Sequence, residues 1–137
     1  MSSLDTDTGQ KQATVLVVDD TPDNLSLMSG LLKDLYKVKV ANNGEKALQI
    51  AGSEAPPDLI LLDISMPVMD GLTMLQKLRE ANEYGKNVPV IFLTNLSASN
   101  EDIVRKVAET EPAYYMVKTS TTPEEVVEKI KERLSRK

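Results

Sequence analysis

Five polar side chains that follow short apolar runs in this sequence could do chemistry together. They are Asp19, Asp20, Asp63, Thr94 and Lys118. Each apolar run has the length of a buried strand, and groups at the carboxyl ends of parallel strands meet at one edge of a sheet. Three carboxylates there could bind a divalent cation, and one could act as a nucleophile beside a hydroxyl and an ammonium group.

Taken one at a time, these residues have ordinary explanations. An aspartate after a strand more often caps a helix or forms a turn, and a threonine hydroxyl more often bonds to nearby backbone. A lysine is usually a solvated charge. The recurrence of reactive groups at four of the five expected strand ends is what favours a functional site.

The composition narrows the chemistry that such a site could do. The chain has 137 residues, 41% of them hydrophobic and 27% charged, which is typical of a single globular domain. It has no His and no Cys, so covalent chemistry must use Asp, Glu, Ser, Thr, Tyr or Lys. The net charge of −5 argues against direct nucleic-acid binding, because Lys and Arg supply the affinity for phosphate backbones.

Nothing in the sequence indicates a membrane span or a secretory signal. No stretch approaches the roughly 20 apolar residues that a span requires, and the first residues are polar. We therefore expect a cytoplasmic protein without membrane contact. Residues 1–12 lack periodicity, which predicts a disordered lead-in, and residues 13–137 are expected to form one domain.

Apolar runs and breaker residues predict five strands. The stretch Lys37–Val40 alternates polar and apolar residues, as an edge strand with one solvated face would. The other four are continuous apolar runs, typical of strands covered on both faces: Thr14–Val18, Leu59–Leu62, Val88–Leu93 and Ala113–Val117.

Helices are predicted between these strands and after the last one. The first is expected to carry its apolar stripe as far as Leu35, and the third to end near Asn82. Their starts are marked by Pro22, by Asn43, by Gly71, by Ser99 with Asp102, and by Thr122 with Pro123 and Glu125. The alternation predicts an α/β fold: a doubly wound five-stranded parallel sheet of order 2-1-3-4-5, the flavodoxin-like (βα)5 arrangement.

Four motifs occur between Thr14 and Leu134. They are Val18-Asp19-Asp20, the run Asp63–Gly71, Thr94, and Tyr115 three residues before Lys118. Together they make the sequence resemble the receiver domains of bacterial two-component response regulators, which serve in phosphorelay signalling.

By this resemblance, Asp63 is the phospho-acceptor, and its donor is a histidine kinase or a histidine phosphotransfer protein. The resemblance also implies that Asp19, Asp20, Asp63 and the backbone carbonyl of Ser65 hold Mg²⁺. Electrostatics supports a cation here, because two carboxylates separated by ~4 Å repel by ~4 kcal/mol at an effective dielectric constant near 20.

The resemblance further implies a switch. Thr94 and Lys118 contact the phosphoryl oxygens, and Tyr115 turns inward when Thr94 moves toward the site. The change alters the face of helix 4, strand 5 and helix 5, where a downstream protein binds. Such a domain is a signalling switch rather than an enzyme, with only slow self-phosphorylation and self-dephosphorylation. It would be a monomer or a phosphorylation-dependent dimer.

Three features depart from the family pattern. Thr119 stands where a Pro is very common, and Asn95 stands where a small residue is usual. Glu111-Pro112 stands where a Gly-Ala turn commonly precedes the fifth strand. The first two bear on the phosphorylation rate, and none removes an acid.

Two other functions remain open from the sequence. One is a receiver-fold protein-binding module that is never phosphorylated, which Thr119 and Asn95 keep open. The other is a phosphohydrolase of the haloacid-dehalogenase type, which also uses an Asp nucleophile and Mg²⁺. That pattern requires a second Asp two residues after the nucleophile, where this chain has Ser65. Acyl-phosphate formation with a small phosphodonor distinguishes the three.

Overall fold

The computed structural model describes residues 13–63, 71–94, 113–117 and 121–135, with the backbone alone for Thr94, Ala113 and Val117. Several expectations fall on other residues and lie outside these ranges. They are the lead-in at 1–12, the carbonyl of Ser65, the effect of Asn95, the helix beginning near Ser99, the turn at Glu111-Pro112, and the roles of Lys118 and Thr119.

The five strands form one parallel sheet of order β2-β1-β3-β4-β5, as the sequence predicts. Because β1 pairs with both β2 and β3, the chain changes its direction of travel across the sheet between β1 and β3. Val18 at the end of β1 pairs with Leu62 at the end of β3, so the residues that follow them are neighbours. The strands are β1 (Thr14–Val18), β2 (Lys37–Ala41), β3 (Leu59–Leu62), β4 (Val90–Thr94) and β5 (Ala113–Val117).

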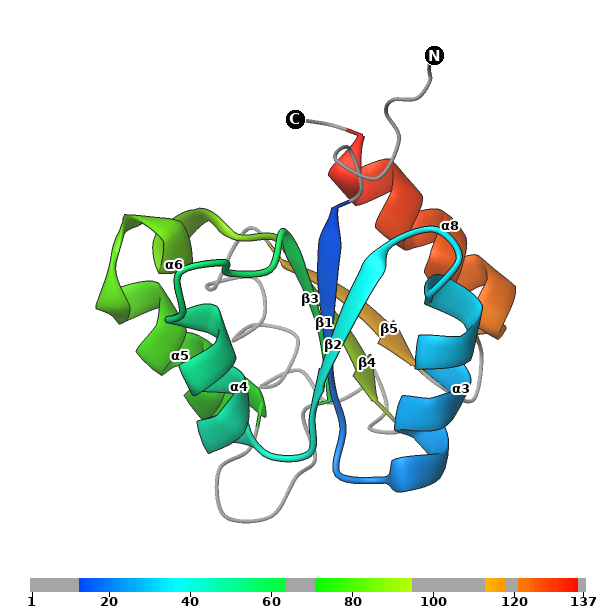
Figure 1. Ribbon diagram of the computed structural model, residues 1–137, viewed down its shortest axis with the longest axis horizontal. Helices are drawn as coiled ribbons and strands as arrows, with labels where there is room; N and C mark the ends of the chain where they lie inside the picture. The colour runs from blue at the N-terminus through cyan, green and yellow to red at the C-terminus, as the bar shows by residue number, and fades with distance from the viewer. Residues whose placement is uncertain (1–12, 64–70, 95–112, 118–120, 136–137) are drawn as a thin grey trace.

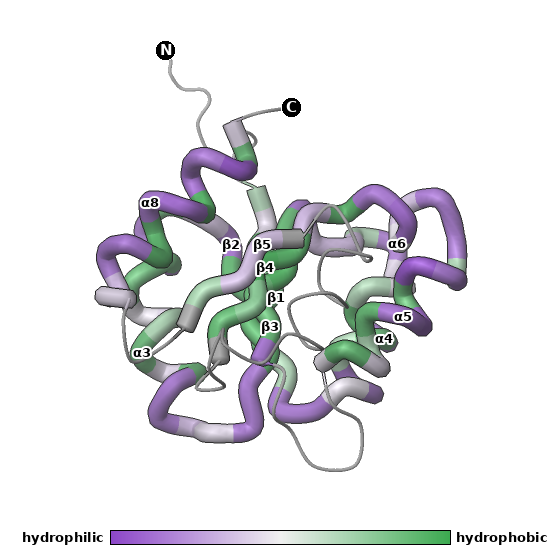
Figure 2. Tube along the Cα trace, turned by 180° about the vertical axis from the view of Figure 1, so that it is seen from behind, coloured by the Kyte–Doolittle hydropathy of each residue, from purple (hydrophilic) through white to green (hydrophobic). Residues whose placement is uncertain are grey.

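Helices cover both faces of the sheet (Figure 1). One face packs against α3 (Pro22–Leu32) and α8 (Pro123–Leu134), and the other against α4 (Gly44–Ala51), α5 (Gly71–Ala81) and α6 (Glu83–Asn87). Figure 2 shows the hydrophobic residues concentrated along the strands between these layers. Within the described ranges, no helix combines the length and the apolar composition needed to cross a bilayer.

Successive side chains of a strand point to opposite faces of the sheet, which produces two apolar clusters. In β1, Val15 and Val17 belong to the cluster beneath α3 and α8, whereas Leu16 and Val18 belong to the cluster beneath α4 and α5. All four residues of β3 are buried, as expected for a strand covered on both faces. Burial of this apolar surface is the main favourable contribution to folding.

The helix starts follow the capping signals in the sequence. The side chain of Asn43 accepts a hydrogen bond from the Lys46 N–H at 2.8 Å. At α8 the Glu125 N–H donates to the Thr122 hydroxyl at 3.1 Å, and the Thr122 N–H donates to Glu125 Oε1 at 2.7 Å. This reciprocal capping box satisfies two N–H groups that the helix leaves without partners, and fixes where α8 begins.

Two expectations about element boundaries are wrong, and one short helix was not predicted. α3 ends at Leu32, so Leu35 falls in the following turn and is 41% exposed. β4 begins at Val90, because Pro89 has no N–H with which to pair. A short helix, α6, occupies residues that carry no apolar period, and Asn82 caps it by accepting the Gly85 N–H at 2.7 Å.

Hydrogen bonds tie α6 to its neighbours. Arg79 Nη1 donates to the carbonyls of Gly85 at 2.9 Å and Val88 at 2.7 Å, which satisfies oxygens near the end of α6. The Tyr84 hydroxyl donates to the Pro57 carbonyl at 2.7 Å, just before β3 begins. Burial raises the pKa of Tyr84, and the nearby Asp58 raises it further. The Tyr84 bond thus connects α6 to the start of β3, at the end opposite the acids.

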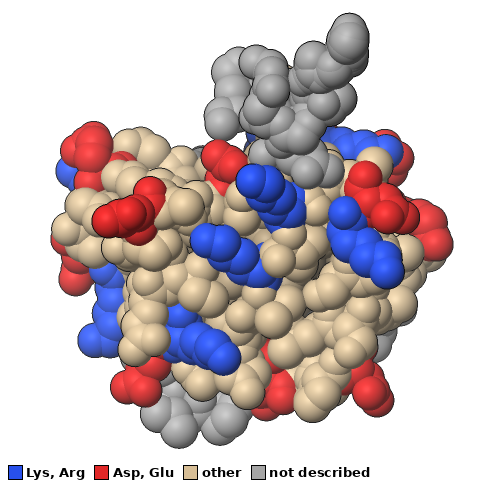
Figure 3. Space-filling model, viewed as in Figure 1, with Lys and Arg blue, Asp and Glu red and all other residues tan. Residues whose placement is uncertain are grey.

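The outer edge of β2 carries charge. Lys37 is exposed, and Lys39 Nζ donates to the Ala55 carbonyl at 2.9 Å. In Figure 3, basic side chains lie across the middle of this face and acidic ones lie nearer its rim. Lysines on an edge strand oppose pairing with another chain, because pairing would bring like charges together and remove them from water.

We expect Gly85→Ala to lower the free energy of unfolding by about 1–3 kcal/mol, because a Cβ there would clash with the backbone carbonyl of Leu78. Gly30→Ala is the matched control, since open space surrounds its position in α3. The control should gain about 0.5–1 kcal/mol from reduced backbone entropy in the unfolded chain. Urea denaturation of both variants measures the difference, and equal effects would contradict the close packing of α5 on α6.

Candidate functional site

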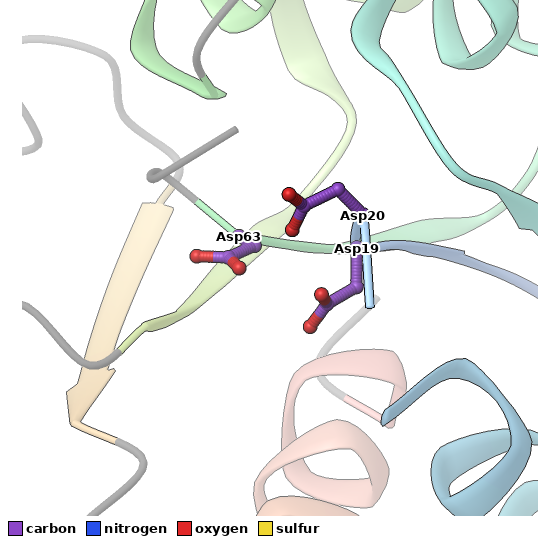
Figure 4. Close-up of side chains that lie close together, drawn as sticks. All are labelled: Asp19, Asp20 and Asp63. Atoms are coloured by element: carbon purple, nitrogen blue, oxygen red, sulfur yellow. The ribbon is translucent and has the colours of Figure 1, made fainter. Parts of the chain in front are cut away.

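Three aspartates meet at the carboxyl edge of the sheet (Figure 4). Asp19 and Asp20 follow β1, and Asp63 follows the adjacent β3. One carboxylate oxygen from each lies within 4.8 Å of the others. This is the juxtaposition that the parallel order predicts, because β1 and β3 flank the point where the chain changes direction.

Backbone hydrogen bonds hold two of these acids in place. The Asp19 N–H donates to the Ala41 carbonyl of β2 at 3.1 Å, and the Asp63 N–H donates to the Val18 carbonyl of β1 at 3.0 Å. Both bonds extend the strand ladders by one residue. The positions of these two Cα atoms are therefore fixed by the sheet rather than by a loop.

The three carboxylates differ in exposure. Asp19 is 5% exposed and Asp63 is 6% exposed, whereas Asp20 is open to solvent. A buried carboxylate is costly unless hydrogen bonds or opposite charge compensate it. Two acids retained together in so little water, beside a third, form a site of high negative potential that favours a cation.

Two groups at the start of α3 bond to Asp19. The Thr21 N–H donates to Asp19 Oδ1 at 2.9 Å, and Asn24 Nδ2 donates to Asp19 Oδ2 at 3.3 Å. Thr21 is the N-cap of α3, yet its own side chain makes no capping bond. The Asp19 carboxylate thus bonds at the start of this helix while it also faces the other two acids.

A cavity of about 190 Å³ adjoins the aspartates on the α3 and α8 side of the sheet. Asp19, Asp63 and Asn24 line its polar part, and Thr121 lies beside the start of α8. The remaining lining residues are apolar side chains from the strands and the two helices, among them Leu27, Met28, Leu61 and Val126. Asp19 and Asp63 therefore border open volume and not only neighbouring side chains.

The other expected site residues are placed only in part. Thr94 is the last residue of β4, and its backbone pairs with Val117 of β5, the residue before Lys118. Tyr115 pairs with Phe92 and packs, partly buried, against the α4 and α5 cluster, and burial raises the pKa of its hydroxyl. The structure thus brings the three acids together and places the backbone of Thr94 and the ring of Tyr115 on the neighbouring strands.

Sequence reasoning missed the support that Asp19 receives. Neither Thr21 nor Asn24 was predicted to take part in the site. The available signal was a polar side chain in the first turn of the helix that follows the Asp pair. Such residues are common at helix N-termini because they cap the helix, so the sequence alone gives only a weak signal.

The sequence of this chain matches one known protein family over most of its length. The model of the response regulator receiver domain matches residues 15–131. The chain belongs to this family. Its five-stranded parallel sheet and its cluster of acidic residues are those of a receiver domain of a signalling switch.

Several curated proteins contain a similar receiver domain. A probable cyclic di-GMP phosphodiesterase of Vibrio cholerae is 42% identical over 91 residues, which cover 66% of this chain and 20% of that protein. The nitrate/nitrite response regulator protein NarL of Escherichia coli is 39% identical over 98 residues, covering 69% of this chain and 43% of NarL. The transcriptional regulatory protein PrrA of Mycobacterium leprae is 37% identical over 132 residues, covering 96% of this chain and 54% of PrrA. The receiver chain thus spans between a fifth and about half of the length of these relatives.

Solved receiver structures agree with the fold. The chemotaxis protein CheY4 of Vibrio cholerae has a TM-score of 0.79 at 28% identity, with 88% of this chain and 98% of that chain covered. The receiver domain of Francisella response regulator 1452 also has a TM-score of 0.79, at 26% identity, with 91% of this chain and 98% of that chain covered.

The close approach of the acids predicts a metal-free stability effect. We expect Asp63→Asn to raise the free energy of unfolding by about 1–2 kcal/mol in EDTA, because it removes one charge from the cluster while keeping the side-chain shape. Chemical denaturation with and without 1 M salt measures it, and salt should shrink the gain by screening the wild-type repulsion. A destabilised Asp63→Asn would show that the Asp63 charge is stabilised by its surroundings more than it is repelled.

Proposed function

We propose that this receiver domain accepts a phosphoryl group on Asp63 from a histidine kinase or a histidine phosphotransfer protein, in a reaction that requires Mg²⁺. The observation that carries the proposal is the cluster of three carboxylates within 4.8 Å, two of them buried. The composition excludes His and Cys as acceptors, because the chain has neither, so a covalent phosphoryl group must be carried by an oxygen nucleophile or a lysine.

The residues present suit Mg²⁺. The three acids offer carboxylate oxygens, and Mg²⁺ characteristically takes one or two carboxylates, keeps several waters and binds phosphate oxygens with the rest. The carbonyl of Ser65 would add a further oxygen. When bound, the ion would neutralise the cluster so that an anionic carboxylate can approach an anionic phosphoryl group.

Asp63 would be the nucleophile of an in-line transfer. One of its carboxylate oxygens would form a bond to phosphorus as the bond from phosphorus to the donor imidazole nitrogen breaks, and the imidazole leaves with that electron pair. The Lys118 ammonium and the Thr94 hydroxyl would each bind a phosphoryl oxygen. Asp63 follows the end of β3, where the sheet holds its backbone, so it would not need to move to meet the donor.

Similarity to sensor kinases supports the choice of donor. Sensor histidine kinase TmoS of Ectopseudomonas mendocina is 43% identical over 83 residues, covering 61% of this chain and 8% of the kinase. Sensor histidine kinase GacS of Pseudomonas protegens is 40% identical over 90 residues, covering 64% of this chain and 10% of the kinase. Domains of this sequence type thus occur within histidine kinases themselves. The proposal places the protein in the cytoplasm, where ATP-dependent kinases act.

Thr94 and Tyr115 would transmit the phosphorylated state. Thr94 ends β4, next to β5, which carries Tyr115 partly buried against the core. A shift of Thr94 toward the phosphoryl group would open space for the Tyr115 ring, and the face formed by the helix expected within 95–112, β5 and α8 would change. A downstream protein, or a second phosphorylated copy, would bind this face.

The first test is a direct measurement of the acyl phosphate. With a small phosphodonor and Mg²⁺, the wild-type chain should gain about 80 Da, the mass of one phosphoryl group, and Asp63→Asn should gain nothing. Asp58→Asn is the matched control, because Asp58 lies at the other end of β3 and accepts the Thr14 N–H at 2.8 Å. It should be phosphorylated like wild type.

Mass spectrometry also separates the rival functions. No adduct on wild type with any donor would favour a protein-binding module, the function that Thr119 and Asn95 leave open. Rapid multiple turnover of the donor without an accumulated adduct would favour a phosphohydrolase. An undiminished adduct on Asp63→Asn would overturn the assignment of the acceptor.

The proposed switch predicts that Thr94→Ala separates phosphorylation from the conformational change that follows it. This variant should still accept the phosphoryl group but should lose the change at Tyr115, because the bond that draws β4 toward the site is gone. NMR of the Tyr115 ring and of α8 amides before and after phosphorylation measures the change. The same chemical-shift changes in wild type and Thr94→Ala would contradict the proposed route.

A further inference from the structure

Both carboxylate oxygens of Asp19 are held by the first turn of α3. The Thr21 N–H donates to Oδ1 at 2.9 Å, and Asn24 Nδ2 donates to Oδ2 at 3.3 Å. The Thr21 bond comes from the backbone, and any residue but proline could make it. The Asn24 bond depends on one side chain, which makes it specific to this sequence.

The hydrogen bond from Asn24 can affect how the Asp19 carboxylate is oriented. The outer torsion of an aspartate side chain has a broad energy profile, so packing or hydrogen bonds must set the plane of the carboxylate. On the α3 and α8 side, Asp19 and Asn24 both line the cavity of about 190 Å³. The amide of Asn24 approaches from this side.

We propose that Asn24 is a positioning residue that orients the Asp19 carboxylate toward Asp20 and Asp63, and that it sets the preference of the site for Mg²⁺ over Ca²⁺. The inference rests on the proposed function, which requires Mg²⁺ at these acids. Mg²⁺ demands near-ideal octahedral geometry at about 2.0–2.1 Å, whereas Ca²⁺ accepts six to eight oxygens in flexible arrangements. A carboxylate held by fewer hydrogen bonds, and so less firmly oriented, therefore weakens Mg²⁺ binding more than Ca²⁺ binding.

The magnitude follows from the general behaviour of residues that orient metal ligands. Removing such a hydrogen-bond partner typically costs 10–100-fold in metal affinity. The Thr21 bond persists in an Asn24 variant, so the lower end of that range is expected here. A purely structural role is distinguishable, because Asn24 lies in the first turn of a helix, where alanine has the higher helix propensity and the fold should tolerate it.

The experiment compares Mg²⁺ and Ca²⁺ binding to the full chain by NMR titration of backbone amides, with thermal melting as the readout of stability. Asn24→Ala should raise the Kd for Mg²⁺ about tenfold. The Kd for Ca²⁺ should rise less than about threefold, and the metal-free melting temperature should stay within a few degrees. Asn24→Gln, which keeps the amide donor on a longer side chain, should recover most of the Mg²⁺ affinity.

Asn87→Ala is the matched control. Asn87 Nδ2 donates to the Glu83 carbonyl at 2.8 Å on α6, so the substitution removes the same type of side chain and one hydrogen bond away from the acids. Both dissociation constants should match wild type in this variant. Equal Mg²⁺ affinity in wild type and Asn24→Ala, or equal weakening of Mg²⁺ and Ca²⁺, would overturn the role of Asn24.

The outcomes separate this inference from the function on which it rests. If the wild-type chain fails to bind Mg²⁺ at millimolar concentrations, the proposed phosphotransfer site and the role of Asn24 both fall. If wild type binds Mg²⁺ and accepts a phosphoryl group while Asn24→Ala is unchanged in Mg²⁺ affinity, only the role of Asn24 falls.

Discussion

Repulsion among three carboxylates is the constraint that the rest of this structure must withstand. At 4.8 Å two full charges repel by about 3.5 kcal/mol at an effective dielectric constant near 20, before the hydrogen bonds to Asp19 and the solvent around Asp20 reduce the net cost. That is comparable with a large part of the net stability of a domain this size. The sheet offsets it with two apolar clusters, one on each face, whose burial is unaffected by the charge at the edge.

The same sheet makes the repulsion useful, because it holds two of the acids by backbone bonds and leaves the third free to adjust. The N–H groups of Asp19 and Asp63 extend the strand ladders, so neither residue can relax away from the other without breaking a bond in the sheet. Asp20 has an exposed side chain and can rotate to suit a ligand. A site with two fixed acids and one adjustable acid can accept an ion and a phosphoryl group in succession without moving the core.

The sequence predicted the features that depend on strand ends and strand order. β1 and β3 are continuous apolar runs that stop at acids, so their meeting follows from parallel order alone. Features that depend on particular side-chain hydrogen bonds, and not on an apolar period, could not be predicted. α6 has no apolar period and is fixed by the Asn82 cap and by two hydrogen bonds from Arg79. Leu35 continues the apolar period of α3, yet it is exposed because the helix already ends at Leu32. The contact of Asn24 with Asp19 depends on the angle at which α3 leaves the sheet, which no residue pattern encodes.

The acid cluster is connected to two different parts of the molecule, α3 and the pair of strands β4 and β5. Asp19 bonds to Thr21 and Asn24, and so connects the site to α3, whereas Thr94 adjoins β5 and its Tyr115. Linkage requires reciprocity: if bonds from α3 orient Asp19 for a cation, then a bound cation must stabilise the first turn of α3 by the same free energy. A bound ion would therefore be sensed first by α3, and a phosphoryl group first by β4 and β5. Because α3 packs on one face of the sheet and Tyr115 packs against the α4 and α5 cluster on the other, the two effects would leave the site on opposite faces of the sheet.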